Sequence, residues 1–157
     1  MKITLLQVGK TKEKYIEEGI DNYSARLKKY IGFELIILPD IKNARNLPVH
    51  EQKIKEGSKI IKTVTSDDYV VILDEKGKEF STVEFAAWIE KKLMLPKKRI
   101  VFVIGGAWGL PEAVRTRADI LISLSRMTFP HQMVRLLFLE QLYRVLTIIR
   151  GEPYHHE

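Results

Sequence analysis

The chain has 157 residues, 45% of them hydrophobic, and its 26 Lys and Arg residues against 20 Asp and Glu residues give a net charge of +6. This size suits one compact domain, so we expect a single domain over residues 1–157. With no cysteine, disulfides, thiolate metal sites and cysteine nucleophiles are excluded. The sequence also has no signal-peptide pattern and no apolar run long enough to cross a membrane, which predicts a cytoplasmic protein.

The first half of the chain predicts strands alternating with helices. The run 3–8 is apolar and closed by Gly9, as expected of a strand buried on both faces. Apolar residues then recur at spacings of four and three, the period of an amphipathic helix that ends before Gly32. This stripe consists of Ile16, Ile20, Tyr23, Leu27 and Tyr30. A strand over 33–39, a loop over 40–50 and a polar helix over about 50–64 follow.

The second half continues the alternation. Residues 69–74 predict a third strand, and the following "EKGKEFS" predicts a turn into a helix that begins at Ser81 with a capping box to Glu84 and ends near Pro96. We expect further strands over 99–106 and 119–124, a short helix over 110–118 with Pro111 near its first turn, and a long helix over 131–150. The alternation predicts an α/β fold, a largely parallel sheet covered by helices on both faces.

Two glycine-containing turns invite comparison with nucleotide-binding motifs, and neither fits. "VGKT" at 8–11 lacks the first glycine of a P-loop. "GGAWGLP" at 105–111 allows a ligand to approach the backbone, but it lacks the spacing of a dinucleotide fingerprint. A plain turn between a strand and a helix explains it equally well.

The histidines form no metal-binding motif, so no metal is expected. His131 directly follows Pro130 and fits a structural role in the first turn of the final helix, with Thr128 or Phe129 as the cap. His155 and His156 fit a flexible tail.

The final helix has an unusually wide apolar surface. At about 100° per residue, its apolar side chains span an arc of roughly 200°, twice the usual core-facing stripe. One sheet cannot cover this arc, so we expect a second subunit against it, with a buried neighbour in the same chain as the alternative. Glu140 and Arg144 are four residues apart and predict an ion pair, unless Arg144 reaches into a site.

The charge pattern favours a polyanionic partner such as nucleic acid, although a solvated basic surface gives the same total. Every basic residue after Glu112 is Arg, which suits bidentate contacts to phosphate or carboxylate. The last third of the chain is therefore the part expected to carry the site.

Three motifs together, "FVIGGAWGLP", "SLSRMTFPHQMVR" and the terminal "RGEPYHHE", closely resemble the small SPOUT-class family of ribosomal large-subunit pseudouridine N3-methyltransferases. The similarity extends from end to end. It implies an α/β knot, in which the C-terminal part threads through a loop, and a homodimer. It further implies S-adenosylmethionine as the methyl donor and N3 of a pseudouridine in a stem-loop of 23S rRNA as the target.

The same resemblance carries functional positions onto this chain. The cofactor positions are Leu73, Gly105, Leu124, Ser125, Arg126, Met127, Thr128 and Phe129. After the fifth strand, the backbone is expected to leave regular structure and offer its amides and carbonyls to the cofactor.

For catalysis, we hypothesise that Arg144 stabilises the developing imide anion and that Tyr154 and His155 position the base or relay the proton, in the partner subunit's site. A surface ion pair and a frayed terminus are the alternatives.

No appended RNA-binding domain is evident, so the dimer surface is expected to select the RNA. Lys10, Lys12, Lys14 and Arg26 are the candidates for phosphate contacts, which predicts RNA binding that falls steeply with salt. Two other functions stay open on the residues alone: a ribosome-binding factor without catalysis on the same fold, and a flavodoxin-like nucleotide-binding protein.

Overall fold

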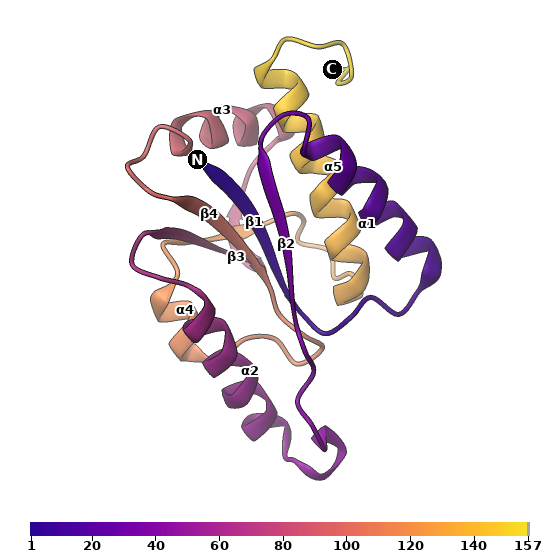
Figure 1. Cartoon of the computed structure of the whole chain (residues 1–157), viewed down its shortest axis with the longest axis vertical. Coiled ribbons are helices and arrows are strands. Elements are labelled where there is room, and N and C mark those ends of the chain that lie inside the picture. Colours follow the sequence, from indigo (N-terminus) through magenta and orange to yellow (C-terminus); the bar gives the residue numbers. More distant parts are fainter. Residues whose placement is uncertain (157) are drawn as a thin grey trace.

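The computed structural model describes residues 1–156, in which strands and helices alternate as expected (Figure 1). The strands are β1 Lys2–Val8, β2 Gly32–Leu38, β3 Asp68–Glu79, β4 Arg99–Ile104 and β5 Ile120–Ser123. The helices are α1 Lys14–Leu27, α2 Val49–Thr63, α3 Thr82–Lys92, α4 Glu112–Arg117 and α5 His131–Ile149, with a short 3-10 helix, Ala44–Asn46, in the loop after β2. Within residues 1–156, no helix has the length and hydropathy of a membrane span.

All five strands run parallel, in the order β2-β1-β4-β3-β5. Helices α1, α3 and α5 pack on one face of this sheet, and α2 and α4 pack on the other (Figure 1). Each residue from Ile3 to Val8 is buried, which confirms the expected strand covered on both faces. The α/β fold class predicted from the alternation is confirmed. Parallel strands bring all their carboxyl ends to one edge of the sheet, which is where such folds bind ligands.

The start of α3 is fixed by the predicted capping box. The Glu84 amide donates to the Ser81 hydroxyl at 3.1 Å, and the Ser81 amide donates to the Glu84 carboxylate at 2.7 Å. Two amides of the first turn are thereby satisfied, so the chain turns into α3 at a defined residue.

The prediction for residues 75–80 was wrong. Instead of a turn after Asp74, β3 continues to Glu79 and pairs with β5 in two registers, with Ile122 opposite both Leu73 and Lys78. Residues 74–77 leave the strand pairing between these two contacts, and Gly77 passes close to the backbone of Leu121 and Ile122. We call this close passage of residues 74–77 over β5 the crossing. This segment is charged and has no alternation of apolar residues, so a hydrophobic pattern cannot predict the strand. Backbone pairing with β5, rather than apolar burial, stabilises the strand here.

Gly77 is the residue at which this crossing is tightest. A Cβ atom there would lie 2.6 Å from both the amide nitrogen of Ile122 and the carbonyl carbon of Leu121. Both are backbone atoms that cannot rotate away, so only glycine fits. The knot implied by the family resemblance stays a prediction, and this double contact of β3 with β5 supports it.

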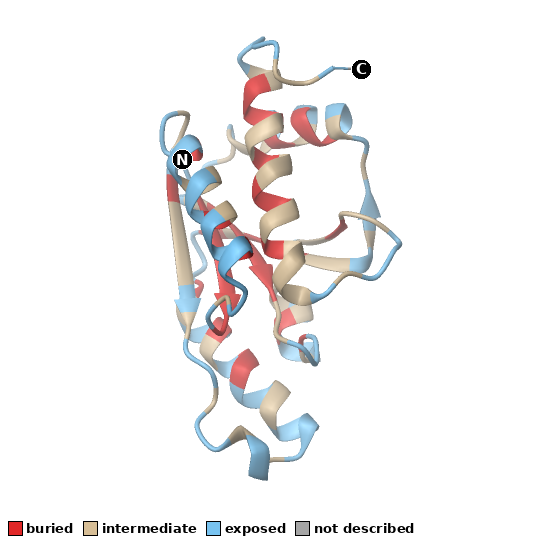
Figure 2. Cartoon of the chain, turned by 90° about the vertical axis from the view of Figure 1, so that its right-hand side faces the viewer, coloured by how far each residue is buried: buried red, intermediate tan, exposed pale blue. Residues whose placement is uncertain are grey.

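The wide apolar arc of α5 is partly covered within the chain. None of its residues from His131 to Ile149 is fully exposed (Figure 2). Helix α1 packs closely on one side, where a Cβ at Gly19 would lie 2.7 Å from Leu136, and α3 packs on the other, where Thr82 donates to Gln141 at 2.9 Å. The alternative of a neighbour in the same chain therefore explains part of the arc, and the dimer stays a prediction.

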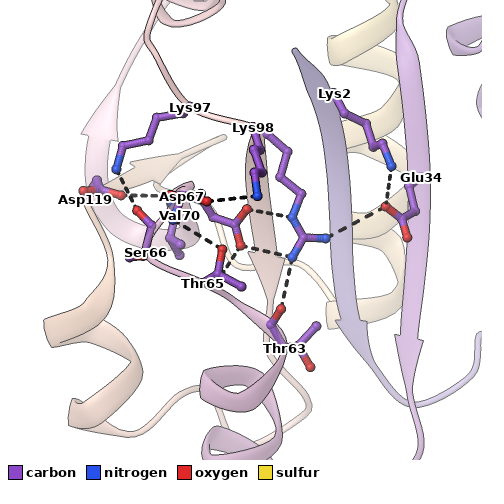
Figure 3. A network of polar contacts seen from close by, with 12 residues as sticks. Lys2, Glu34, Thr63, Thr65, Ser66, Asp67, Val70, Lys97, Lys98 and Asp119 are labelled. Atoms are coloured by element: carbon purple, nitrogen blue, oxygen red, sulfur yellow. Dashed lines mark hydrogen bonds and ion pairs between the residues drawn. The ribbon is translucent and has the colours of Figure 1, made fainter.

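An ionic network ties together the amino ends of the strands, at the edge opposite the ligand-binding edge (Figure 3). Arg99 of β4 donates to the buried carboxylate of Asp68 on β3 at 2.8 Å and lies 3.9 Å from Glu34 on β2. Burial would raise the pKa of Asp68, but hydrogen bonds from Arg99 and Thr65 outweigh it and lower the pKa below the usual range. The carboxylate is therefore charged and paired at neutral pH.

Gly77→Ala should destabilise the protein by about 3 kcal/mol or more, because the new methyl group meets backbone that cannot move. Gly32→Ala is the matched control, since its Cβ would lie 3.5 Å from a flexible Lys2 side chain, an ordinary contact. Its effect should stay within about 0.5 kcal/mol. Urea unfolding of both variants measures this, and equal stabilities would show that the crossing is not tight.

Candidate active site

A cavity of about 510 Å³ opens beside the middle of β3 and the carboxyl ends of β4 and β5. Three segments form its walls: residues 73–76 after the straight part of β3, residues 104–110 with the glycine-rich turn, and residues 124–131 between β5 and α5. Arg115 and Val134 complete the lining. Its volume is typical of a pocket that encloses a small organic ligand.

Seven of the eight predicted cofactor positions line this cavity. They are Leu73, Gly105, Leu124, Ser125, Met127, Thr128 and Phe129. Arg126 does not line it: its side chain is 83% exposed and lies 3.4 Å from Glu79. The segment after β5 therefore presents one face to the cavity and turns the side chain of Arg126 outward.

Hydroxyl groups hold this segment where the strand ladder ends. The Ser123 hydroxyl donates to the Ser125 carbonyl at 2.8 Å, and the Met127 amide donates to the Ser125 hydroxyl at 3.0 Å. The Thr128 hydroxyl donates to Glu75 at 3.1 Å across the cavity. Short polar side chains thus replace ladder bonds and fix an irregular backbone.

The structure corrects the prediction for the start of α5. Pro130, not Thr128 or Phe129, is the N-cap residue, and no side chain caps the helix. His131, which we assigned a structural role, lies in the cavity wall. Its burial, and then the charges of Arg135 and Lys12, lower the pKa of His131 below 6.5, so the ring is neutral at physiological pH and offers one donor and one acceptor.

Sequence reasoning missed the ion pair between Asp74 and Arg115 in the same cavity, at 2.6 Å. Burial opposes the charged form, but the Lys76 amide and Arg115 hold the pKa of Asp74 below its usual range. The position of Asp74 in the sequence could have indicated a site residue. Asp74 is the first charged residue after a buried apolar run, where a parallel strand reaches the ligand-binding edge of the sheet.

Arg135 is the second missed residue. It is fully buried on α5 and donates to the Val8 carbonyl at 2.7 Å and to Thr11 at 3.1 Å. Burial lowers the pKa of its guanidinium, and no carboxylate in the described part of the chain forms an ion pair with it. Arg135 therefore fastens the segment after β1 to α5.

Glu56 on α2 lies behind the glycine-rich turn. Its carboxylate is buried, one oxygen has no hydrogen-bond partner, and that oxygen lies 3.2 Å from where a Cβ at Gly106 would be. Burial, and then the charge of Asp40, raise the pKa of Glu56, while Lys59 opposes them. An unpartnered buried carboxylate is costly, so Glu56 lowers the stability of the chain.

The three predicted catalytic residues gather around Glu140, far along α5. Arg144 donates to Glu140 at 2.9 Å and lies 3.3 Å from the His155 ring nitrogen Nδ1, and Tyr154 donates to Glu140 at 3.4 Å. We call Arg144, Tyr154 and His155 the tail cluster. Burial, and then a hydrogen bond with Tyr23, raise the pKa of Tyr154 to about 12, so the phenol keeps its proton at neutral pH.

The tail folds back on its own helix instead of fraying. Gly151 adopts a left-handed φ of 71° and donates to the Ile148 carbonyl at 2.9 Å, and the Glu152 amide donates to Thr147 at 2.9 Å, a Schellman-type helix end. Tyr30, in the turn after α1, then donates to the Glu152 carboxylate at 2.5 Å. Residues 151–155 are therefore held beside α1 and α5.

The cavity and the tail cluster lie toward opposite ends of α5. Val134 lines the cavity, and Arg144 is ten residues further along, about 15 Å at 1.5 Å per residue. A second cavity of about 320 Å³ lies between them; it shares Leu124, Ser125 and Phe129 with the first and reaches Glu140. Within one chain, the tail cluster does not reach the first cavity.

A family model described as "Predicted SPOUT methyltransferase" matches residues 1–155. The chain belongs to the SPOUT methyltransferase family. Two relatives, from Parabacteroides distasonis and Christiangramia forsetii, carry the name "Ribosomal RNA large subunit methyltransferase H". The first is 53% identical over 157 residues and covers 100% of both chains, and the second is 53% identical over 156 residues and covers 99% of both.

Solved structures resemble this SPOUT methyltransferase in fold. The tRNA (m1G37) methyltransferase of Aquifex aeolicus matches with a TM-score of 0.57 at 17% identity, covering 100% of this chain and 76% of that chain. A probable methylase family protein of Haemophilus influenzae matches with a TM-score of 0.50 at 14% identity, covering 99% and 70%. The flavodoxin-like alternative is set aside by the family membership.

Glu56→Gln should stabilise the protein at neutral pH by about 1 kcal/mol, because it removes a buried charge without a partner. A raised folded pKa means that stability is lost as the pH rises from 4.5, the unfolded value, through the folded value. The gain from the substitution should therefore be present at pH 8 and nearly vanish at pH 4. Urea unfolding at both pH values measures it, and a loss of stability at pH 8 would mean that the carboxylate has a favourable partner.

Proposed function

We propose that this chain is a cytoplasmic methyltransferase that transfers a methyl group from S-adenosylmethionine to N3 of a pseudouridine in 23S rRNA of the large ribosomal subunit. The observation that carries the proposal is identity of about one half, over the full length, to proteins named ribosomal RNA large subunit methyltransferases. A ribosome-binding factor without catalysis is disfavoured, because such a factor has no use for an intact cofactor cavity in a methyltransferase family.

The residues of the first cavity suit S-adenosylmethionine. The backbone of residues 124–129 offers amides and carbonyls to an adenosine, and Gly105, Gly106 and Gly109 allow a ligand to lie against the opposite wall. Leu73 and Leu110 provide apolar contact, and the carboxylates of Asp74 and Glu75 lie in the same lining, where Asp74 pairs with Arg115. The bound donor supplies an electrophilic methyl group on a sulfonium.

The chain's part of the reaction is to align the nucleophile and to manage one proton. The imide N3 must lose its proton to attack the methyl group in line, so a negative charge develops on the base. Arg144 stabilises that charge: hydrogen bonding to Glu140 raises the pKa of Arg144, which keeps it cationic. Tyr154, protonated at neutral pH, donates a hydrogen bond to the nucleobase, and His155 takes up the N3 proton and passes it to solvent water.

The tail cluster is proposed to act in the cavity of a second copy. Methyl transfer requires contact at about 3 Å, and α5 separates the tail cluster from its own cavity by about 15 Å. A homodimer formed over the outer surface of α5, where Val134 and Leu137 are only half-buried, brings one copy's tail toward the other's cavity. Lys10, Lys12 and Lys14, all exposed, and the exposed Arg26 are proposed to contact RNA phosphates.

Mixing two inactive variants tests this division of labour. One variant lacks residues 152–157 and keeps its cavity; the other carries Ser125→Trp, which fills the cavity and keeps the tail. Each alone should lose methylation of large ribosomal subunits by about 100-fold. After exchange of subunits, the mixture should recover about a quarter of the wild-type activity, because half of the dimers are mixed and each has one complete site.

Two controls support the test: the truncated variant should bind S-adenosylmethionine within a few-fold of the wild type by calorimetry, and both variants should sediment as dimers. A mixture that stays inactive would mean that the tail serves its own chain. Wild-type protein that transfers no labelled methyl group to any ribosomal RNA would refute the proposed function itself.

A further inference from the structure

Trp108 is an exposed aromatic residue that neither the fold nor the cofactor cavity explains. Its side chain is 54% exposed on the turn between β4 and α4. A single exposed apolar side chain is common in proteins and needs no function. Trp108 differs because of how rigidly it is presented and because of what surrounds it.

A tight turn presents this indole. The Gly109 amide donates to the Gly106 carbonyl at 3.1 Å, the two glycines form an isolated antiparallel bridge, and Gly109 has a φ of +80°. Ala107 and Trp108 therefore occupy the two corner positions of a β-turn. A closed turn fixes the backbone, so the ring is offered to a partner at little cost in conformational entropy.

The turn forms the rim of the cofactor cavity. Gly106, Ala107 and Gly109 line the cavity, and Trp108, which lies between them in the chain, is exposed and does not line it. Met127, also in the lining and 74% exposed, adds a second exposed apolar side chain to the same site. A ligand that extends beyond the cavity therefore has exposed apolar side chains of this turn and of residue 127 within the neighbouring surface.

Positive charge lies on another side of the same mouth. Lys10, Lys12 and Lys14 are exposed in the segment that follows β1, and Arg135 fastens that segment to α5. The Lys12 amide also donates to the Gln132 side chain at 2.8 Å, next to His131 in the cavity wall. Between residues 10 and 14, Glu13 is the only acidic residue.

We propose that Trp108 is a base-stacking residue for the RNA substrate: its indole stacks on a nucleobase next to the target nucleotide, while the lysines at 10, 12 and 14 neutralise the phosphates. This proposal rests on the proposed function, because it takes RNA as the substrate. An exposed ring beside a cationic segment is the arrangement that binds unpaired nucleotides, since every base has a face to stack and every nucleotide carries a phosphate. Stacking in such sites contributes about 10- to 100-fold in affinity per base.

The test compares Trp108→Ala and Trp108→Phe with Met94→Ala. Met94 is 82% exposed in the turn between α3 and β4, at the opposite edge of the sheet, so it controls for the loss of an exposed apolar side chain. Trp108→Ala should raise the Kd for large ribosomal subunits, and the KM in methylation, by about 10-fold or more. Trp108→Phe should keep most of the wild-type affinity for large ribosomal subunits, and Met94→Ala should leave both the Kd and the KM unchanged.

Tryptophan fluorescence gives a readout that does not depend on turnover. The chain has two tryptophans, and Trp88 packs among Phe80, Phe85 and Tyr69. Stacking on a base quenches indole emission, so a stem-loop RNA should quench the wild type and leave Trp108→Phe nearly unchanged. Quenching without methyl transfer would uphold the stacking and refute the proposed function.

Three outcomes would overturn the stacking proposal. Unchanged RNA affinity in Trp108→Ala would do so directly. A weaker Kd for S-adenosylmethionine, with RNA affinity unchanged, would make Trp108 a cover for the cofactor. A shift from dimer to monomer in sedimentation, again with RNA affinity unchanged, would make it a contact between two copies of the chain.

Discussion

The crossing of residues 74–77 over β5 is the constraint on which the site depends. It is a contact of backbone with backbone, permitted by the missing side chain of Gly77, and it leaves no freedom in how β3 and β5 lie against each other. Residues 73–76, which include most of the crossing, and residues 124–129, which follow β5, form two walls of the first cavity, joined by the hydrogen bond from Thr128 to Glu75. The cavity is thus a direct product of the chain's path, and its shape does not rely on side-chain packing alone.

The two parts of the proposed active site, the first cavity and the tail cluster, lie at different positions along helix α5. Helix α5 begins in the cavity wall at His131 and carries the tail cluster near its end, and every residue between is at least half-covered by α1, α3 and the sheet. Such a helix is a rigid spacer and cannot shorten. The cavity and the tail cluster therefore have fixed positions in each chain, and the proposed function uses a second copy to bring one chain's tail cluster to the other chain's cavity.

Much of this fold could be predicted from the sequence. The alternation of buried runs with 3.6-residue periods predicted every strand and helix of five or more residues, and the Ser81 capping box was correct to the residue. The extension of β3 could not be predicted, because a charged segment held by backbone pairing has no apolar period. Arg135 and Glu56 were missed for a related reason: burial of a charged side chain depends on distant segments that meet only in the folded chain.

The two edges of the sheet divide the molecule's tasks. The ionic network around Arg99 and Asp68 fixes the amino ends of the strands, and the lining of the first cavity lies at the other edge of the sheet. Substitutions in this network therefore fall on residues outside the lining of the first cavity. Such a layout gives protein engineers a place to raise the heat resistance of the chain without altering the residues that line the cavity.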